Sequence, residues 1–349
     1  MMEAERQKTL QSQFASDGPL RPILTSLNGD NSWLLSFPRP EEERSSTGKA
    51  YCHIVFEPWL NGPTSLFTSW VIHLQQTQTP ALGNPEAINA AIRQIETAAS
   101  SGASTNGVAN GETDKRDNGI DAIFLGFHYL DHVHEPTLRL FDASIPVIGT
   151  PEAIAIVKPW NHFTTIKTIS NFDSSATSWR DEGLHPGSPF PSWLTPLRLL
   201  GHHELNYVTV LIWSHSSPNG SITHEAILQT PHGTKLDVGP LEAFLASSPP
   251  TQKLALLHGL KESRAGGSMN TYGAAGGLAL YRKIGGAKYW VSTHSSPLAY
   301  SGVVMRLLWV NDTPRTVDWA LEQESKEGGK EGGKPDFREV RNGDCLVLV

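Results

Sequence analysis

Short apolar segments alternate with helix-like segments between residues 119 and 160. Residues 119–127, GIDAIFLGF, and residues 145–150, IPVIGT, have the length and composition of buried strands. Each is followed by a segment with a proline near its start and apolar residues for a core face, EPTLRLFDAS and PEAIAIVKPW. This strand, helix, strand, helix order predicts an α/β architecture.

Further strands are expected on both sides of this region. Residues 23–37 place two apolar stretches around the turn sequence Asn-Gly-Asp, which is typical of a hairpin. Residues 50–60 alternate and then reach a proline, which marks a strand leaving the sheet. Later strands are expected at residues 205–215, 223–233, 254–260 and 287–295, and helices at residues 85–100 and 272–285.

The remaining segments suggest how the chain is divided. We expect a main domain at residues 22–322, preceded by a flexible leader at residues 1–21. Residues near 99–118 are small, polar and rich in turn formers, so we expect a disordered insertion there. Residues 323–349 repeat Lys-Glu-Gly-Gly and end in CLVLV, which predicts a polar linker and a short C-terminal strand.

Composition narrows the choice of partners. The formal net charge is -7 and no basic stripe is evident, so nucleic acid is not expected as a partner. The two cysteines, Cys52 and Cys345, lie outside any Cys-x-x-Cys pair, which argues against a thiolate zinc site or a disulfide framework. The N-terminus lacks the apolar run of a secretory signal, and no apolar stretch is long enough for a membrane span. We therefore expect a cytoplasmic protein.

Three groups of polar residues stand at the ends of predicted strands. Asp131, His132 and His134 follow the first of the buried strands, whereas His232 and His294 end two later ones. Carboxylate and imidazole together suit a borderline divalent ion such as Zn²⁺. Each histidine alone could equally be a turn or strand-end residue. Because α/β proteins place ligands at strand ends, their joint position favours a metal site.

Several segments resemble the metallo-β-lactamase superfamily, in its UlaG-like branch with related plant and cyanobacterial hydrolase-like proteins. GDNSWLL and HIVFEPWLNGP resemble its opening hairpin, and DAIFLGFHYLDHVHEPTLRLFDASIPVIGTPEA resembles the segment that carries its HxHxDH motif. AILQTPHG resembles a strand ending in Glu-Pro-His, and GGSMNTYGAAGGLALYRKIGGAKYWVSTH resembles the last helix and a strand ending in Thr-His. These segments keep the family order across about residues 23–300. The resemblance implies a four-layer αββα sandwich.

The chain departs from the family pattern at three positions. Glu57 stands where the family has the Asp of Asp-Pro-Trp-Leu, and Phe127 and Tyr129 stand where the motif has its first two histidines. His128 is offset by one residue, which on a strand turns its side chain to the other face. The branch itself lacks these two histidines and keeps the DHxH string. A full two-metal site is therefore not expected.

The resemblance implies one metal ion, Zn²⁺ or alternatively Mn²⁺ or Fe²⁺, and these ligands: Asp131, His132, His134, His232 and His294. Such an ion would activate a water molecule, and Asp131 would orient or deprotonate that water if it is not a ligand. The expected activity is hydrolysis of an ester, thioester, amide or phosphoester bond in a small molecule. Loss of the two histidines keeps an alternative open, a catalytically inactive protein of this fold that serves as a binding or scaffold module. A third possibility is an oxidoreductase or lyase at the same metal site.

Overall fold

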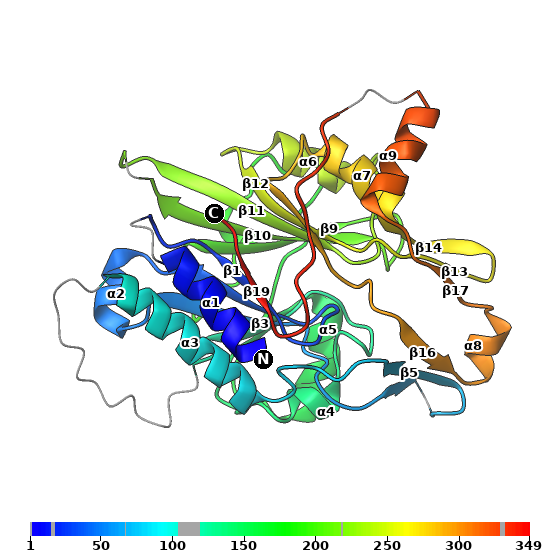
Figure 1. The fold of residues 1–349 in the computed structure, drawn as a ribbon, viewed down its shortest axis with the longest axis horizontal. Coiled ribbons are helices and arrows are strands. Elements are labelled where there is room, and N and C mark those ends of the chain that lie inside the picture. Colours follow the sequence, from blue (N-terminus) through cyan, green and yellow to red (C-terminus); the bar gives the residue numbers. More distant parts are fainter. Residues whose placement is uncertain (1, 15–17, 67, 104–118, 218, 329–331) are drawn as a thin grey trace.

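The computed structural model describes residues 2–14, 18–66, 68–103, 119–217, 219–328 and 332–349. Two large β-sheets lie face to face at its centre, and helices cover the outer face of each sheet (Figure 1). This is the four-layer αββα sandwich expected from the sequence. No helix in the described ranges combines the length and apolar character that crossing a bilayer requires.

The first sheet has seven strands. In spatial order they are β19 (Cys345–Val347), β1 (Ile23–Ser26), β2 (Trp33–Pro38), β3 (Tyr51–Phe56), β6 (Ala122–Leu125), β7 (Val147–Gly149) and β8 (Ile166–Thr168). The helices beside it are α1 (Met2–Phe14), α2 (Glu41–Thr47), α3 (Pro85–Ala103), α4 (Glu135–Leu138), α5 (Pro151–Val157) and the 3₁₀ turn η1 (Lys158–Trp160).

The second sheet has six strands. In spatial order they are β18 (Phe337–Arg338), β15 (Tyr289–Ser292), β12 (Gln252–His258), β11 (Ile222–Thr230), β10 (Tyr207–Ser216) and β9 (Leu194–Leu200). Its outer face carries α6 (Gly239–Ala246) and α7 (Gly273–Lys283), with α9 (Val317–Lys326) packed on α7. The 3₁₀ turn η2 (Glu182–Leu184) precedes β9.

Two small three-stranded sheets project from one end of the sandwich (Figure 1). One is ordered β14 (Ser268–Tyr272), β13 (Glu262–Ala265) and β17 (Asn311–Thr313), and the other β16 (Leu298–Ser301), β5 (Ile72–Gln76) and β4 (Thr64–Leu66). The short helix α8 (Val303–Leu307) follows β16. These additions were not expected from the sequence.

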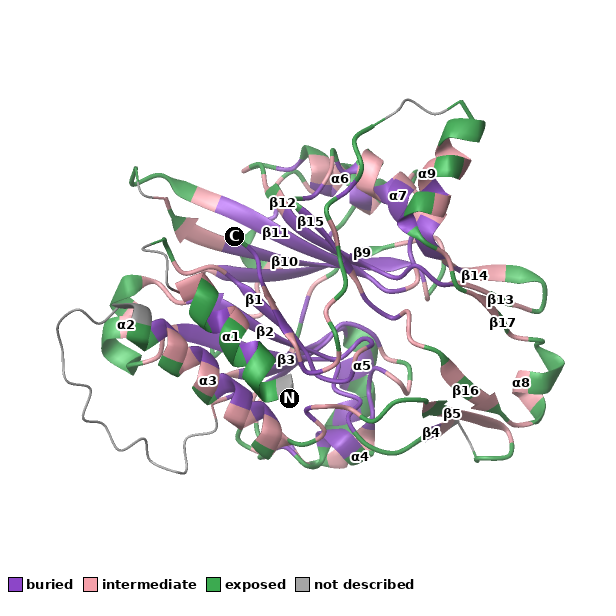
Figure 2. Ribbon diagram, viewed as in Figure 1, coloured by how far each residue is buried: buried purple, intermediate pink, exposed green. Residues whose placement is uncertain are grey.

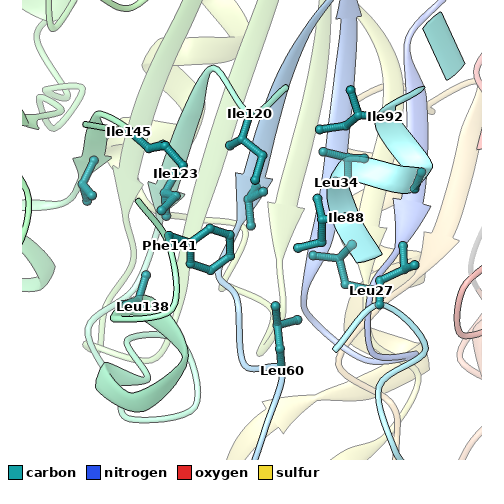
Figure 3. Packing of buried hydrophobic residues seen from close by; sticks show 14 of the residues in the cluster. Leu27, Leu34, Leu60, Ile88, Ile92, Ile120, Ile123, Leu138, Phe141 and Ile145 are labelled. Atoms are coloured by element: carbon teal, nitrogen blue, oxygen red, sulfur yellow. The ribbon is translucent and has the colours of Figure 1, made fainter. Parts of the chain in front are cut away.

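Strand alternation explains the two layers of core around the first sheet. Trp33, Leu35 and Phe37 of β2 point into the space between the sheets, whereas Leu34 points toward the helices. All six residues of β2 are buried, as expected for a strand covered on both faces, and Figure 2 shows the same for most central strands. Figure 3 shows the outer layer, in which Leu34 lies near Ile88 of α3.

Helix α3 is longer than the sequence suggested. Its buried side chains recur at helical spacing, Ile88, Ala91, Ile92, Ile95 and Ala99, and they form one face against the first sheet. The helix runs to Ala103, so the beginning of the insertion expected near residues 99–118 is helical. The rest of that expected insertion, residues 104–118, lies outside the described residues.

Both ends of the chain are tied to the sandwich. Residues 2–14, which we expected to belong to a flexible leader, form α1, and the buried guanidinium of Arg6 donates from Nη1 to the carbonyl of Gly343 at 2.7 Å. In the expected linker, β18 pairs with β15 and β19 pairs with β1. We infer that both ends belong to the same domain as residues 22–322.

Replacing Arg6 with alanine is expected to lower the free energy of unfolding by about 1–3 kcal/mol, because the buried carbonyl of Gly343 would lose its donor. Urea denaturation of the full chain measures this change. The exposed Arg93 of α3 is a matched control, and Arg93→Ala should change stability by less than about 0.5 kcal/mol. Equal effects of the two variants would mean that α1 is not docked.

Parallel pairing decides where the ends of the central strands lie. Strand β3 runs parallel to β6, and β11, β12 and β15 run parallel to one another. The carboxyl ends of parallel neighbours meet at the same edge of a sheet, so residues that follow these strands gather at one end of the sandwich. The small sheets project from this end.

Candidate metal centre

Three histidines from three separate strand ends meet at this edge. His132 lies in the loop after β6, His232 follows β11, and His294 follows β15. One potential ligand atom from each residue lies within 4.8 Å of the other two. The ring centroids are 4.8 to 6.2 Å apart. Residues separated by up to 162 positions in sequence are thus brought into one group, here called the three-histidine group.

Each ring of the three-histidine group faces a polar partner through Nδ1. Nδ1 of His132 lies 2.7 Å from Oε2 of Glu57, and Nδ1 of His232 lies 2.9 Å from the Thr271 hydroxyl. The third contact is an ion-pair distance only, 3.4 Å from Nδ1 of His294 to Oδ2 of Asp30, and this buried Nδ1 has no hydrogen-bond partner. Metal-binding histidines characteristically use their second ring nitrogen in this way, because the contact fixes the orientation of the ring.

The contacts of His132 and His232 leave their Nε2 atoms as the available donors. Nε2 of His132 is buried and has no hydrogen-bond partner. An unpartnered buried nitrogen is costly, and a cation would satisfy it. Neutral imidazole nitrogen is also a donor that Zn²⁺ prefers. The residues present therefore fit a single divalent cation held by His132, His232 and His294.

The surrounding side chains shift the pKa values of two of the histidines in opposite directions. Burial lowers the pKa of His132, but the carboxylates of Glu57 and Asp131 outweigh burial and raise this pKa to about 9. Burial lowers the pKa of His232 well below its usual value, and the nearby His294 and His132 rings lower it further. Neutral imidazole is the form that binds metal, so His232 is ready to bind, whereas His132 would release a proton.

Asp131 lies beside the three-histidine group. Its Oδ2 is 3.5 Å from Nε2 of His132, and its side chain is largely buried. Two ligands of a tetrahedral zinc ion, each at ~2.1 Å from the metal, are separated by roughly 3.4 Å. This separation suits a ligand of the same ion, but Asp131 is not among the residues whose ligand atoms gather within 4.8 Å, so it is placed to act on a molecule bound next to His132.

His134, the fifth expected ligand, is placed differently. It is the residue before α4, and its Nδ1 lies 2.8 Å from the hydroxyl of Thr137, three residues later. Its Nε2 lies 3.3 Å from the carbonyl of Pro63, and its ring lies near Trp59. With both nitrogens facing other partners, His134 does not join the three-histidine group.

Comparison with known proteins places this geometry in a structural context. No protein-family profile and no curated sequence matches the chain. Among solved structures, an isothiocyanate hydrolase from Delia radicum gut bacteria aligns with a TM-score of 0.51 at 13% identity, covering 93% of this chain and 99% of that one. The chain has the metallo-β-lactamase fold. At this identity the likeness concerns the fold alone.

Two further solved structures align less closely. The metallo-β-lactamase fold protein YhfI from Bacillus subtilis has a TM-score of 0.36 at 11% identity, covering 93% of this chain and 99% of that one. Zn²⁺-bound PqqB from Methylobacterium extorquens has a TM-score of 0.43 at 13% identity, covering 94% of this chain and all of that one.

Within this metallo-β-lactamase fold, the position of the first missing motif histidine, Phe127, has a packing role, whereas Tyr129 at the second position is 40% exposed. Phe127 is fully buried, and its ring centroid lies 5.1 Å from that of His132 and 4.9 Å from that of Tyr207. Phe127 therefore forms an apolar wall beside the three-histidine group. His128 turns away from the group, and its Nε2 lies 2.8 Å from a carboxylate oxygen of Glu204.

The residues that orient the three-histidine group were not predicted from the sequence. Glu57 was noted as a departure from the family, but its contact with His132 was not foreseen. Glu57 is fully buried and also accepts a hydrogen bond from the side chain of Asn31. The roles of Asp30 and Thr271 were also not foreseen. Their only sequence signal is proximity to a turn or a strand end.

Gly126 allows the Glu57 carboxylate to reach this position. A Cβ atom added at Gly126 would lie 2.8 Å from Oε1 of Glu57 and 2.9 Å from the hydroxyl oxygen of Thr209. Both oxygens are buried and have no hydrogen-bond partner. Even a methyl group at residue 126 would push Glu57 away from His132.

Gly126→Ala is accordingly expected to cost about 1–3 kcal/mol of stability, as overpacking of a closed interior does. Chemical denaturation of the full chain provides the measurement. Gly183→Ala is the matched control, because a Cβ at Gly183 meets no atom within 4 Å, and its effect should stay below about 0.5 kcal/mol. If Gly126→Ala proved as harmless as Gly183→Ala, the placement of Glu57 would be wrong.

Proposed function

We propose that the chain is a metal-dependent hydrolase with one divalent cation held by His132, His232 and His294. The observation that supports this proposal most strongly is the common arrangement of the three rings. Each comes from a different strand end, each faces a protein partner through Nδ1, and their potential ligand atoms gather within 4.8 Å. Histidines that served only in packing would not need this shared orientation.

Imidazole donors favour Zn²⁺ over the harder cations Mg²⁺ and Ca²⁺. When bound, such a cation polarises a substrate carbonyl or phosphoryl oxygen and lowers the pKa of water. We assign Asp131 to orient the attacking water and to accept its proton, since its carboxylate lies beside His132. Phe127 excludes bulk water on one side of the group and leaves no imidazole there for a second ion.

The substrate class follows from this chemistry. A polarising cation and a carboxylate base suit esters, thioesters, amides and phosphoesters, all of which react by attack of water at an electrophilic centre. The isothiocyanate group has an electrophilic carbon of the same kind, and one solved structure of similar fold is named for hydrolysis of that group. All five classes therefore belong in a substrate screen.

The screen uses the full chain with added Zn²⁺ or Mn²⁺, and chromogenic representatives of each substrate class. We expect turnover that a chelator abolishes and that the metal restores. We expect Asp131→Asn to lower kcat by about 10²–10⁴-fold with the metal still bound, because general-base catalysis contributes that much. A turnover rate that neither the chelator nor the Asp131→Asn substitution changes would refute the proposal.

A second candidate is a catalytically inactive metallo-β-lactamase-fold protein that binds a ligand. The observation that favours it is Phe127, which replaces a motif histidine and fills the adjoining space. Stoichiometric metal binding without turnover of any of the five classes would support this candidate over a hydrolase.

A further inference from the structure

An exposed apolar surface lies at the end of the molecule that carries the three-histidine group. We call it the α8 patch, and its side chains are those of Trp70, Val303, Leu307, Leu308 and Trp309. Trp309, Leu307 and Trp70 are 83%, 75% and 67% exposed. Figure 2 shows α8 at the outer edge of the structure, beside β5 and β16. Large apolar side chains gathered in this way mark interaction sites.

The backbone holds these side chains together. The amide of Val303 donates to the carbonyl of Trp70 at 2.8 Å, which joins α8 to the segment before β5. Val303 and Leu307 are one helical turn apart and therefore share a face of α8. The α8 patch is thus formed by two segments, α8 with the residues that follow it and the segment before β5, which the backbone hydrogen bond holds together.

Around the α8 patch, the charged side chains that form no ion pair in the described part of the chain are both arginines. Residues 64–76 contain no Asp, Glu, Lys or Arg, and residues 298–311 contain only Arg306. The neighbouring hairpin of β13 and β14, residues 262–272, contains Glu262 and Arg264, and Glu262 forms an ion pair with Arg315 at 3.0 Å. Both arginines are exposed, in a chain whose formal net charge is -7. The next carboxylate along the chain, that of Asp312, forms an ion pair with Lys261, with Nζ 3.0 Å from Oδ2.

We propose that the α8 patch docks on an anionic lipid surface. Tryptophan suits the boundary between headgroups and acyl chains, leucine and valine add apolar area below it, and arginine attracts anionic headgroups. A second copy of the chain fits less well. A two-fold dimer through this patch would bring Arg264 and Arg306 against the same cationic surface of the partner.

Docking in this way would place the three-histidine group near the lipid. Strand β16 leads from the loop of His294 directly into α8. Lys261 connects the two regions, since its Nζ contacts both Asp312 and the carbonyl of Ser296. Lipid docking requires no bound cation, so its test does not depend on the proposed hydrolysis.

The test is co-sedimentation of the full chain with vesicles of phosphatidylcholine, with or without phosphatidylserine. We expect binding to vesicles that contain phosphatidylserine. Trp309→Ser and Leu307→Ser should each weaken binding about tenfold, and Arg264→Gln and Arg306→Gln about fivefold each. Ile222→Ser is the matched control, because Ile222 is 62% exposed at the start of β11, away from α8, and its variant should bind as the parent does.

Three results would overturn the proposal. The first is the absence of binding to either kind of vesicle. The second is equal binding by the Trp309→Ser and Ile222→Ser variants. The third is a concentration-dependent dimer in sedimentation velocity that Trp309→Ser abolishes while vesicles remain unbound, which would assign the patch to self-association.

Discussion

His232→Ala is expected to weaken binding of Zn²⁺ by more than roughly a hundredfold, because even loss of a residue that merely orients a ligand costs 10–100-fold. Among the three ligands, His232 is the one whose deletion is expected to disturb the rest of the protein least. The pKa of His232 lies well below its usual value, so the substitution removes a neutral ring and leaves no buried charge unpaired. Competition against a chromogenic chelator measures the affinity.

His132→Ala should also remove the metal, but it would leave the fully buried Glu57 without its histidine partner. A loss of stability of about 3–5 kcal/mol would accompany it, as for other broken buried ion pairs. His203→Ala is the matched control, because His203 is an exposed histidine outside the three-histidine group. Retention of full zinc affinity by His232→Ala would exclude His232 as a ligand.

Glu57→Gln is the second substitution with a large expected effect, a 10–100-fold loss of zinc affinity. The carboxylate of Glu57 fixes the ring of His132 through Nδ1 and makes the opposite nitrogen more basic. The amide is nearly isosteric but carries no charge, so it would keep the packing and lose the electrostatic contribution. The same competition assay measures the change.

Another histidine and glutamate pair supplies the control for this experiment. Nε2 of His53 in β3 lies 2.9 Å from Oε1 of Glu96 in α3, and both residues are outside the three-histidine group. Glu96→Gln should lower stability and leave zinc affinity unchanged. If Glu57→Gln also lowered stability and left zinc affinity unchanged, the contact of Glu57 with His132 would be structural only.

The central strands were predictable because buried strands are recognisable in the sequence as continuous apolar runs. The hairpin at residues 23–37 is observed as β1 and β2, and the apolar run 254–260 contains most of β12. Residues 2–14 and the small sheets could not be predicted in this way. They are polar or partly exposed, and their positions depend on tertiary contacts such as that of Arg6 with Gly343.

The candidate site was predictable where ligands follow strands. His232 and His294 each follow a parallel strand, and parallel strands bring their carboxyl ends to one edge. His134 was grouped with His132 because the resemblance to the family carries over the whole DHxH string. The chain is not extended there, since the amide of His132 donates to the carbonyl of Tyr129 in a turn. In this turn His134 becomes the residue before α4, and its ring nitrogens face Thr137 and Pro63.

Residues that only orient the ligands are hard to recognise in a single sequence. Asp30 lies in the β1–β2 turn, where aspartate is also a common turn residue. Thr271 lies in β14 and reaches His232 from another sheet. Contacts of this kind depend on the packing of distant segments.

Anomalous scattering at the zinc absorption edge, from crystals of the zinc-loaded chain, tests the central claim most directly. We expect one peak, at ~2.1 Å from a ring nitrogen of each of His132, His232 and His294. A zinc peak elsewhere, or no peak among these three rings, would contradict the metal centre.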